Sequence, residues 1–143
     1  MARAIEALDR ERQAVAAAYG VETATFLDFF YRAGYTSRRA WEARSVFEAL
    51  RDSVPNRYIK APPNLEGRYI QEDIGFGLVP LHAFAQRADV AVPTVEAFIH
   101  LASVATGVPY QRTGLTAERL GIAGASREEV VELARRGPWR SRA

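Results

Sequence analysis

Apolar residues recur at helical spacing along most of the chain, and this pattern predicts a series of amphipathic helices. The first stripe lies in residues 4–18, where Ala is frequent and the larger apolar positions are Ile5, Leu8, Val15 and Tyr19. Gly20 follows at once and is a plausible helix terminator. An aromatic-rich run in residues 23–32 predicts a second, short helix that ends before Gly34.

A third helix is predicted after Ser37, a residue that can cap a helix N-terminus. Its large apolar positions are Trp41, Val46, Phe47 and Leu50. The helix should end before Pro55, where a stretch rich in Pro and Asn begins. Residues 53–67 have little periodicity and therefore predict a long connection, and connections of this length inside a domain are often functional.

The second half of the chain repeats the helical pattern. A fourth helix is expected over residues 78–88, and a fifth from Pro93 to Gly107. Residues 116–121 predict a short helical turn. Ser126 and Glu129 have capping-box spacing for a last helix that ends at Gly137–Pro138. Because no strand-like alternation is found, we expect an all-α domain, an irregular bundle of about five to seven helices.

Composition narrows the classes of function. The chain has 143 residues, 48% of them hydrophobic and 25% charged, which is typical of one globular domain. It has no Cys and two His, so disulfides and thiolate chemistry are excluded and we assign no metal site. No apolar run approaches a membrane span, and the charged first residues resemble no secretory signal. We therefore expect a cytoplasmic protein with no membrane partner.

The basic residues give no nucleic-acid footprint. All but Lys60 of the 19 basic residues are Arg, but acids alternate with them, as in Asp9-Arg10-Glu11-Arg12. Such alternation indicates a solvated helix face, so we expect no nucleic-acid partner. Gly75-Phe76-Gly77 is the one Gly-x-Gly sequence, and the third Gly of a dinucleotide fingerprint is Pro80 here. We assign no cofactor-binding residue in this chain.

Arg68 and Asp73 are the candidate site residues. They follow the Pro-rich connection and Gly67, and an Arg at a helix start can bind an organic anion. Residues five apart lie about 140° around an α-helix, so the two groups share a site only if Arg68 lies in or before the first turn. The alternative is that Arg68 forms a surface ion pair with Glu72, and spacing alone favours this alternative.

The sequence around these residues resembles the octopine/nopaline (opine) dehydrogenase family. The resemblance is most specific in YIKAP and RYIQEDIGFGLVP, at residues 58–62 and 68–80. It is looser in LDRER, AAAYGV, VAVPT and IHLAS, at residues 8–12, 16–21, 90–94 and 99–103. Overall it covers residues 1–123, which leaves 124–143 as a C-terminal helix and basic tail. Gly75 stands where the family usually has Pro, which we expect to loosen the turn after Asp73.

The resemblance implies both a fold and a reaction. Family members join an N-terminal Rossmann domain to an α-helical domain similar to the C-terminal domain of 6-phosphogluconate dehydrogenase. They condense an amino acid with a 2-oxo acid and reduce the imine with NAD or NADP, which is bound mainly by a domain not in this chain. Arg68 would bind the oxo-acid carboxylate beside Tyr69, and Asp73 would orient a catalytic His. We thus expect Arg68 and Asp73 to be catalytic and Arg68 and Tyr69 to bind substrate.

The family's catalytic His lies upstream of this chain, and neither His82 nor His100 matches its position. With the Rossmann domain also absent, we expect the chain to be inactive alone. It would associate with a Rossmann-domain partner or form a homodimer. The alternative is a non-catalytic helical interaction module, a degenerate relative of the family.

Overall fold

The computed structural model describes residues 1–65 and 67–136, and every regular element within them is helical. The all-α class is therefore confirmed. Three elements form the main body: α1 (Ala2–Ala18), a rod that ends in α6 (Val79–Arg87), and α7 (Pro93–Thr106). Their shared core is a set of buried residues: Val15, Ile74, Val79, Ala85, Val92, Val95, Ile99 and Tyr110. As predicted, Pro93 lies in the first turn of α7 and Gly107 ends that helix with φ of 72°.

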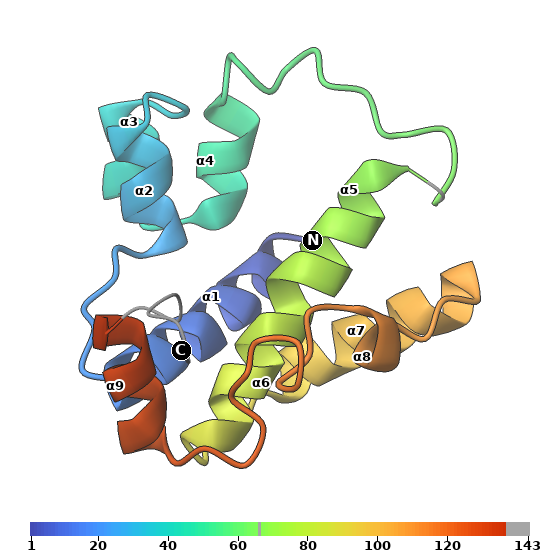
Figure 1. Ribbon diagram of the computed structural model, residues 1–143. Helices are drawn as coiled ribbons and strands as arrows, with labels where there is room; N and C mark the ends of the chain where they lie inside the picture. Colours follow the sequence, from blue (N-terminus) through green and yellow to red (C-terminus); the bar gives the residue numbers. More distant parts are fainter. Residues whose placement is uncertain (66, 137–143) are drawn as a thin grey trace.

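The rod is one continuous helical segment that changes its winding along its length (Figure 1). It begins as α5 (Arg68–Ile70), continues as a π-helix, η1 (Gln71–Leu78), and becomes α6. The predicted fourth helix therefore begins ten residues earlier than its apolar stripe indicates. Apolar periodicity misses this start because residues 68–73 are largely polar and exposed.

Three short helices form a small cluster beside the main body (Figure 1). They are α2 (Phe26–Arg32), α3 (Arg38–Glu42) and α4 (Val46–Asp52). Leu27, Phe30 and Ala49 are the buried centre of this cluster, and Trp41 packs against them. From α4, residues 53–65 run without a helix toward α5, as the sequence predicts.

The single helix predicted after Ser37 is wrong, because the structure has two helices there. Ser37 does cap α3, but the chain then turns at Arg44, whose φ is 52°. The side chain of Ser45 accepts a hydrogen bond from the Glu48 N–H at 3.3 Å and so caps α4. The break separates two helix axes that a continuous helix would have kept in line.

The C-terminal part adds α8 (Tyr110–Thr113) and α9 (Arg127–Arg136). The predicted capping box of α9 is confirmed. Ser126 N–H donates to the Glu129 carboxylate at 2.7 Å, and Glu129 N–H donates to the Ser126 hydroxyl at 3.2 Å. Val130 packs α9 against Ala83 and Ile122. The predicted short helical turn is present, because the Leu120 N–H donates to the Thr116 carbonyl at 2.9 Å. The expected end of α9 at Gly137–Pro138 lies outside the described residues.

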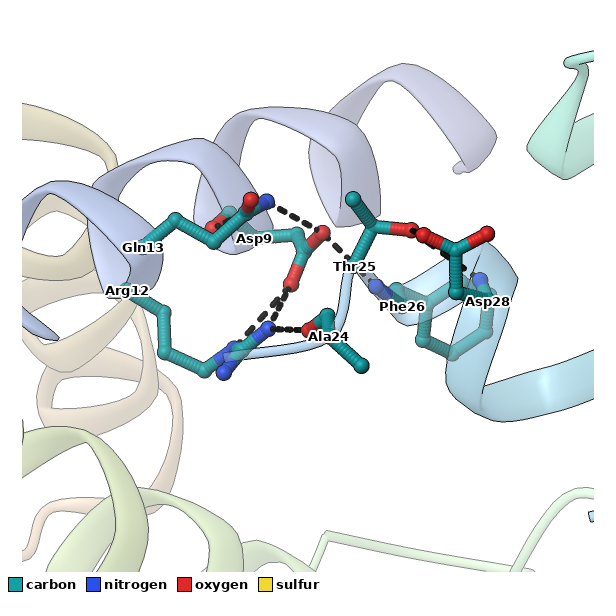
Figure 2. Close-up of polar contacts among 7 residues, drawn as sticks. All are labelled: Asp9, Arg12, Gln13, Ala24, Thr25, Phe26 and Asp28. Carbon is teal, nitrogen blue, oxygen red and sulfur yellow. Dashed lines mark hydrogen bonds and ion pairs between the residues drawn. The ribbon is translucent and has the colours of Figure 1, made fainter. Parts of the chain in front are cut away.

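The charged run near the start of the chain is a set of tertiary caps, which corrects the expectation of a solvated face. The Asp9 side chain is only 12% exposed. Its carboxylate accepts hydrogen bonds from Arg12 Nη2 at 2.7 Å, Gln13 Nε2 at 2.9 Å and the Phe26 N–H at 2.8 Å (Figure 2). Arg12 also donates to the Ala24 carbonyl at 2.6 Å. The group ties α1 to the start of α2.

Glu11 plays the matching part for α7. Its two carboxylate oxygens accept the N–H groups of Thr94 and Val95 at 2.8 and 2.9 Å. These N–H groups belong to the first turn of a helix, where a negative charge is favourable.

Within the described residues, no helix combines the length and apolar character needed to span a bilayer.

Candidate functional site

The segment from Arg68 to Leu78 carries the predicted site, and its winding differs from that of an α-helix. Gly67 precedes it in extended conformation, with φ of −65° and ψ of 152°. In η1 the hydrogen bonds span five residues, as in the Val79 N–H that donates to the Ile74 carbonyl. A π-helical turn is rare and is frequently found at functional sites.

One side of η1 is held firmly against the main body. Ile74 is buried in the main core with Tyr110, and Gly75 is buried beside it. The Leu115 N–H donates to the Gly75 carbonyl at 2.8 Å. A Cβ placed on Gly75 would make ordinary contacts with Tyr110 at 3.5 Å and with Gly114 at 3.8 Å, so this packing does not itself require glycine. That Gly75 loosens the turn after Asp73 stays a prediction.

The opposite side of the segment faces outward and carries all the predicted site residues. The Arg68 side chain is 78% exposed, Tyr69 is 62% exposed and Asp73 is also exposed. The wider turn of η1 brings residues five apart closer to one face than the about 140° separation of an α-helix. Arg68 and Asp73 thus lie on an open helical surface together with Phe76, which is 62% exposed.

Arg68 is engaged with a neighbour on the same surface. Its Nε lies 3.3 Å from a carboxylate oxygen of Glu72, and its guanidinium lies 6.0 Å from the centre of the Tyr69 ring. This is the surface ion pair that spacing alone favours, and such exposed pairs contribute little to stability. Within residues 1–65 and 67–136, the Asp73 carboxylate has no hydrogen-bond or ion-pair partner.

Neither histidine lies on the surface formed by residues 68–76. His82 is mostly buried on α6, with Nε2 3.2 Å from a carboxylate oxygen of Glu96 on α7. Together with Gln86 and Gln111, His82 lines a polar hollow of about 340 Å³. Sequence periodicity could not predict this hollow, because its lining comes from separate segments of the chain. His100 is exposed on α7. The described residues of the surface around Asp73 therefore include no histidine that Asp73 could orient.

The described residues do not form a dinucleotide site of the Rossmann type. Such a site needs a strand, a Gly-rich turn and the open N-terminus of a helix. Here Gly75 and Gly77 lie inside η1, with their backbone in a continuous helix and no strand before them in the described part of the chain. Within the same residues, no three His, Asp or Glu side chains are grouped so that they could hold a metal ion.

Comparison with known proteins gives the family. Residues 1–106 match the model of the NAD/NADP octopine/nopaline dehydrogenase α-helical domain. The chain belongs to this family. The family match contains α1 to α7, with the whole of the outward face of η1, and stops before α8 and α9.

Two curated relatives agree with this membership of the octopine/nopaline dehydrogenase family. An opine dehydrogenase of Arthrobacter sp. (strain 1C) is 31% identical over 119 residues, 83% of this chain and 32% of the relative. Protein ocs of Agrobacterium tumefaciens (strain Ach5) is 28% identical over 127 residues, 89% of this chain and 34% of the relative. The chain thus spans about a third of the length of either relative.

Proposed function

We propose that this chain is the substrate-binding part of an opine dehydrogenase-like oxidoreductase that acts on CH–NH groups. The reaction class is the NAD- or NADP-dependent reductive condensation of an amino acid with a 2-oxo acid. The family membership supports the proposal, together with one structural observation. Arg68, at the start of α5, and Asp73, in the π-wound η1, are both exposed on one continuous helical rod, and Asp73 has no partner among the described residues.

Arg68 would anchor the carboxylate of the 2-oxo acid. Its planar guanidinium suits bidentate carboxylate binding, and its present partner Glu72 is 55% exposed and so is replaced at little cost. Tyr69, next to the Arg68 guanidinium, would form one wall for the substrate. Asp73 would accept a hydrogen bond from a histidine of the cofactor-bearing part, and a carboxylate so placed raises the pKa of an imidazole.

The cofactor-bearing part would complete the site by covering the outward face of residues 68–76. Phe76 and Tyr69 give that face an apolar component that a second domain would bury. Since family members bind NAD or NADP mainly in a Rossmann domain, we infer that the chain alone reduces no imine. Purified chain mixed with NADH or NADPH, an amino acid and pyruvate should show no steady oxidation of the cofactor. We place the boundary of this domain at residue 123, with 124–143 as an addition to it.

A chimera tests the role of Arg68. Residues 1–123 would replace the matched segment of the Arthrobacter enzyme, whose remaining part supplies the cofactor domain. Arg68→Ala should raise the KM for the 2-oxo acid about thirty-fold or more, because losing the partner of a desolvated charge costs about 2 kcal/mol or more. Steady-state kinetics with the oxo acid varied would measure it.

Arg38→Ala is the matched control. Arg38 forms the same kind of ion pair with Glu42, four residues on, and the two side chains are 76% and 52% exposed. The control should leave the KM unchanged. Equal KM values for both variants in an active chimera would show that Arg68 is not the anchor.

The Arg68–Glu72 ion pair favours a second candidate, a non-catalytic helical interaction module. In that case the pair is a surface feature with no ligand. Titration of pyruvate into the chain, followed by NMR at the amides of Tyr69 to Gly77, separates the two. Saturable shifts confined to these amides favour the substrate site, and no shifts favour the interaction module.

A further inference from the structure

A second concave feature lies between α1, α6 and α9. It is a groove of about 580 Å³ whose lining is mostly apolar, with Leu81 and Phe84 from α6, Tyr19 from the end of α1, and Val131 and Ala134 from α9. This volume is in the range of small-molecule sites, which are also mostly apolar with a few polar groups. Leu81 lies 13 residues along the rod from Arg68, so the groove is separate from the surface around Arg68.

The groove also contains positive charge and no acid. Arg12 and Arg135 are its only charged lining residues among those described. Arg12 is already matched, because its guanidinium is paired with Asp9 and also donates to the Ala24 carbonyl. Arg135 is therefore the charged group of the groove that is available to bind a ligand.

The acids of α9 are all engaged elsewhere. Glu128 pairs with Arg127, Glu129 closes the capping box with Ser126, and Glu132 pairs with Arg136. Within residues 1–65 and 67–136, Arg135 has no carboxylate partner. The helix dipole favours a cation in the last turn of α9. This accounts for a basic residue in that turn, but not for the position of Arg135 beside an apolar groove.

We propose that this groove binds an amphipathic monocarboxylate, a molecule with an apolar body and one acid group. The body would lie on Leu81 and Phe84, and the carboxylate would pair with Arg135. The basic tail of the chain, with Arg140 and Arg142, has the same charge sign as Arg135 and is a poorer match for it.

Isothermal titration of the full chain with decanoate and with its neutral analogue decan-1-ol tests the proposal. Decanoate should bind at one saturable site, and more tightly than the alcohol. Ala134→Trp fills the groove from an exposed position of α9 and should abolish binding. Arg135 is exposed, so Arg135→Gln should weaken decanoate about two- to five-fold and leave the alcohol unchanged.

Arg136→Gln is the control for Arg135→Gln. It removes a cation from the same helical turn but not from the groove, so decanoate affinity should stay at the wild-type value. Thermal unfolding of each variant shows that the fold is intact. No saturable binding to the wild-type chain, equal affinity for acid and alcohol, or binding that survives Ala134→Trp would each overturn the proposal.

Discussion

At the scale of single residues, the most consequential groups are two acids of α1 that cap other helices. Asp9 holds the start of α2 through the Phe26 N–H, and Glu11 holds the start of α7 through Thr94 and Val95. Charge-assisted hydrogen bonds of this kind are stronger than neutral ones, and each one here joins parts that are distant in the sequence.

Asp9→Ala should lower the free energy of unfolding by about 1.5–3 kcal/mol, because three partly buried donors lose the carboxylate that accepts their hydrogen bonds. Urea unfolding followed by circular dichroism would measure the change. Glu42→Ala, which removes only the exposed partner of Arg38, should cost about 0.5 kcal/mol or less. Equal losses in the two variants would contradict the structural role given to Asp9.

Asp28 makes part of the stability depend on pH. The Trp41 indole N–H, which donates to its carboxylate at 2.8 Å, lowers the pKa of Asp28 below its ordinary value, and the Thr25 hydroxyl adds to this. The folded state therefore holds the proton less tightly than the unfolded state. The contribution is complete above the ordinary Asp pKa near 4 and is lost as pH falls through the lower folded pKa.

The expected result is a steeper fall in thermal stability below about pH 4 for the wild-type chain than for Asp28→Asn. Melting curves at pH 6 and at pH 3, followed by near-ultraviolet circular dichroism, would show it. A variant with the same pH dependence as the wild type would mean that other carboxyl groups control this range.

At the scale of elements, the contact between η1 and α8 depends on a close approach of two backbones. A Cβ atom placed on Gly114 would lie 2.6 Å from the Gly75 carbonyl oxygen and 2.8 Å from the Tyr110 carbonyl oxygen. Both obstacles are backbone atoms, so neither can move without displacing a helix. A side chain at Gly114 would therefore push η1 and α8 apart.

Gly114→Ala should destabilise the fold by about 1–3 kcal/mol, the usual cost of forcing extra volume into a packed contact. Differential scanning calorimetry would record the lower melting temperature. Gly67→Ala should be close to neutral, because the nearest atom to its added Cβ is Pro62 Cβ at 3.9 Å. A neutral Gly114→Ala would show that α8 can shift away from η1.

The sequence was sufficient for elements with local signals. The Ser126–Glu129 box and the Gly107 stop are both confirmed because each acts within one helical turn. Ser45 and Glu48 have the same spacing as the Ser126–Glu129 capping box, so the start of the separate helix α4 is also encoded locally. The apolar pattern alone does not reveal it. The caps from Asp9 and Glu11 could not be predicted, since Glu11 and Thr94 are 83 residues apart.

The sequence predicts which residues form the candidate site, but it does not predict the local geometry of that segment. The motif at residues 68–80 led to Arg68, Tyr69 and Asp73, and the family match contains all three. The π-helical winding was not predictable, because over eight residues an apolar pattern does not distinguish a π-helix from an α-helix. The roles of these residues stay predictions until the chimera is measured.

At the scale of the whole molecule, stability is divided unequally between the main body and the α2–α4 cluster. Helices α1 and α7 share a core with fully buried Val95 and Ile99, whereas the cluster is centred on Leu27, Phe30 and Ala49. The cluster joins the rest through α4 against α1 and through the bonds to Asp9. A small core with few connections opens at lower free energy.

Native-state hydrogen exchange should therefore show slower exchange, by roughly ten-fold or more, at the amides of Val95 and Ile99 than at those of Phe30 and Ala49. Asp9→Ala should speed exchange in the cluster more than in α7. Uniform protection across both regions would indicate that the molecule opens only as one cooperative unit.

The π-helix affects how the site depends on the length of the chain. Residues before η1 are joined to α6 through a run in which every hydrogen bond encloses one more residue than usual. Each residue of an α-helix adds about 100° of rotation, and each residue of the wider η1 turns adds less. Deleting one residue between Asp73 and Val79 would let α winding replace the wide turns, and the tighter winding would regain much of the rotation that the lost residue supplied. Arg68 would then keep nearly the same direction relative to α6, so in homologous chains a single gap at this place is compatible with an unchanged anchor.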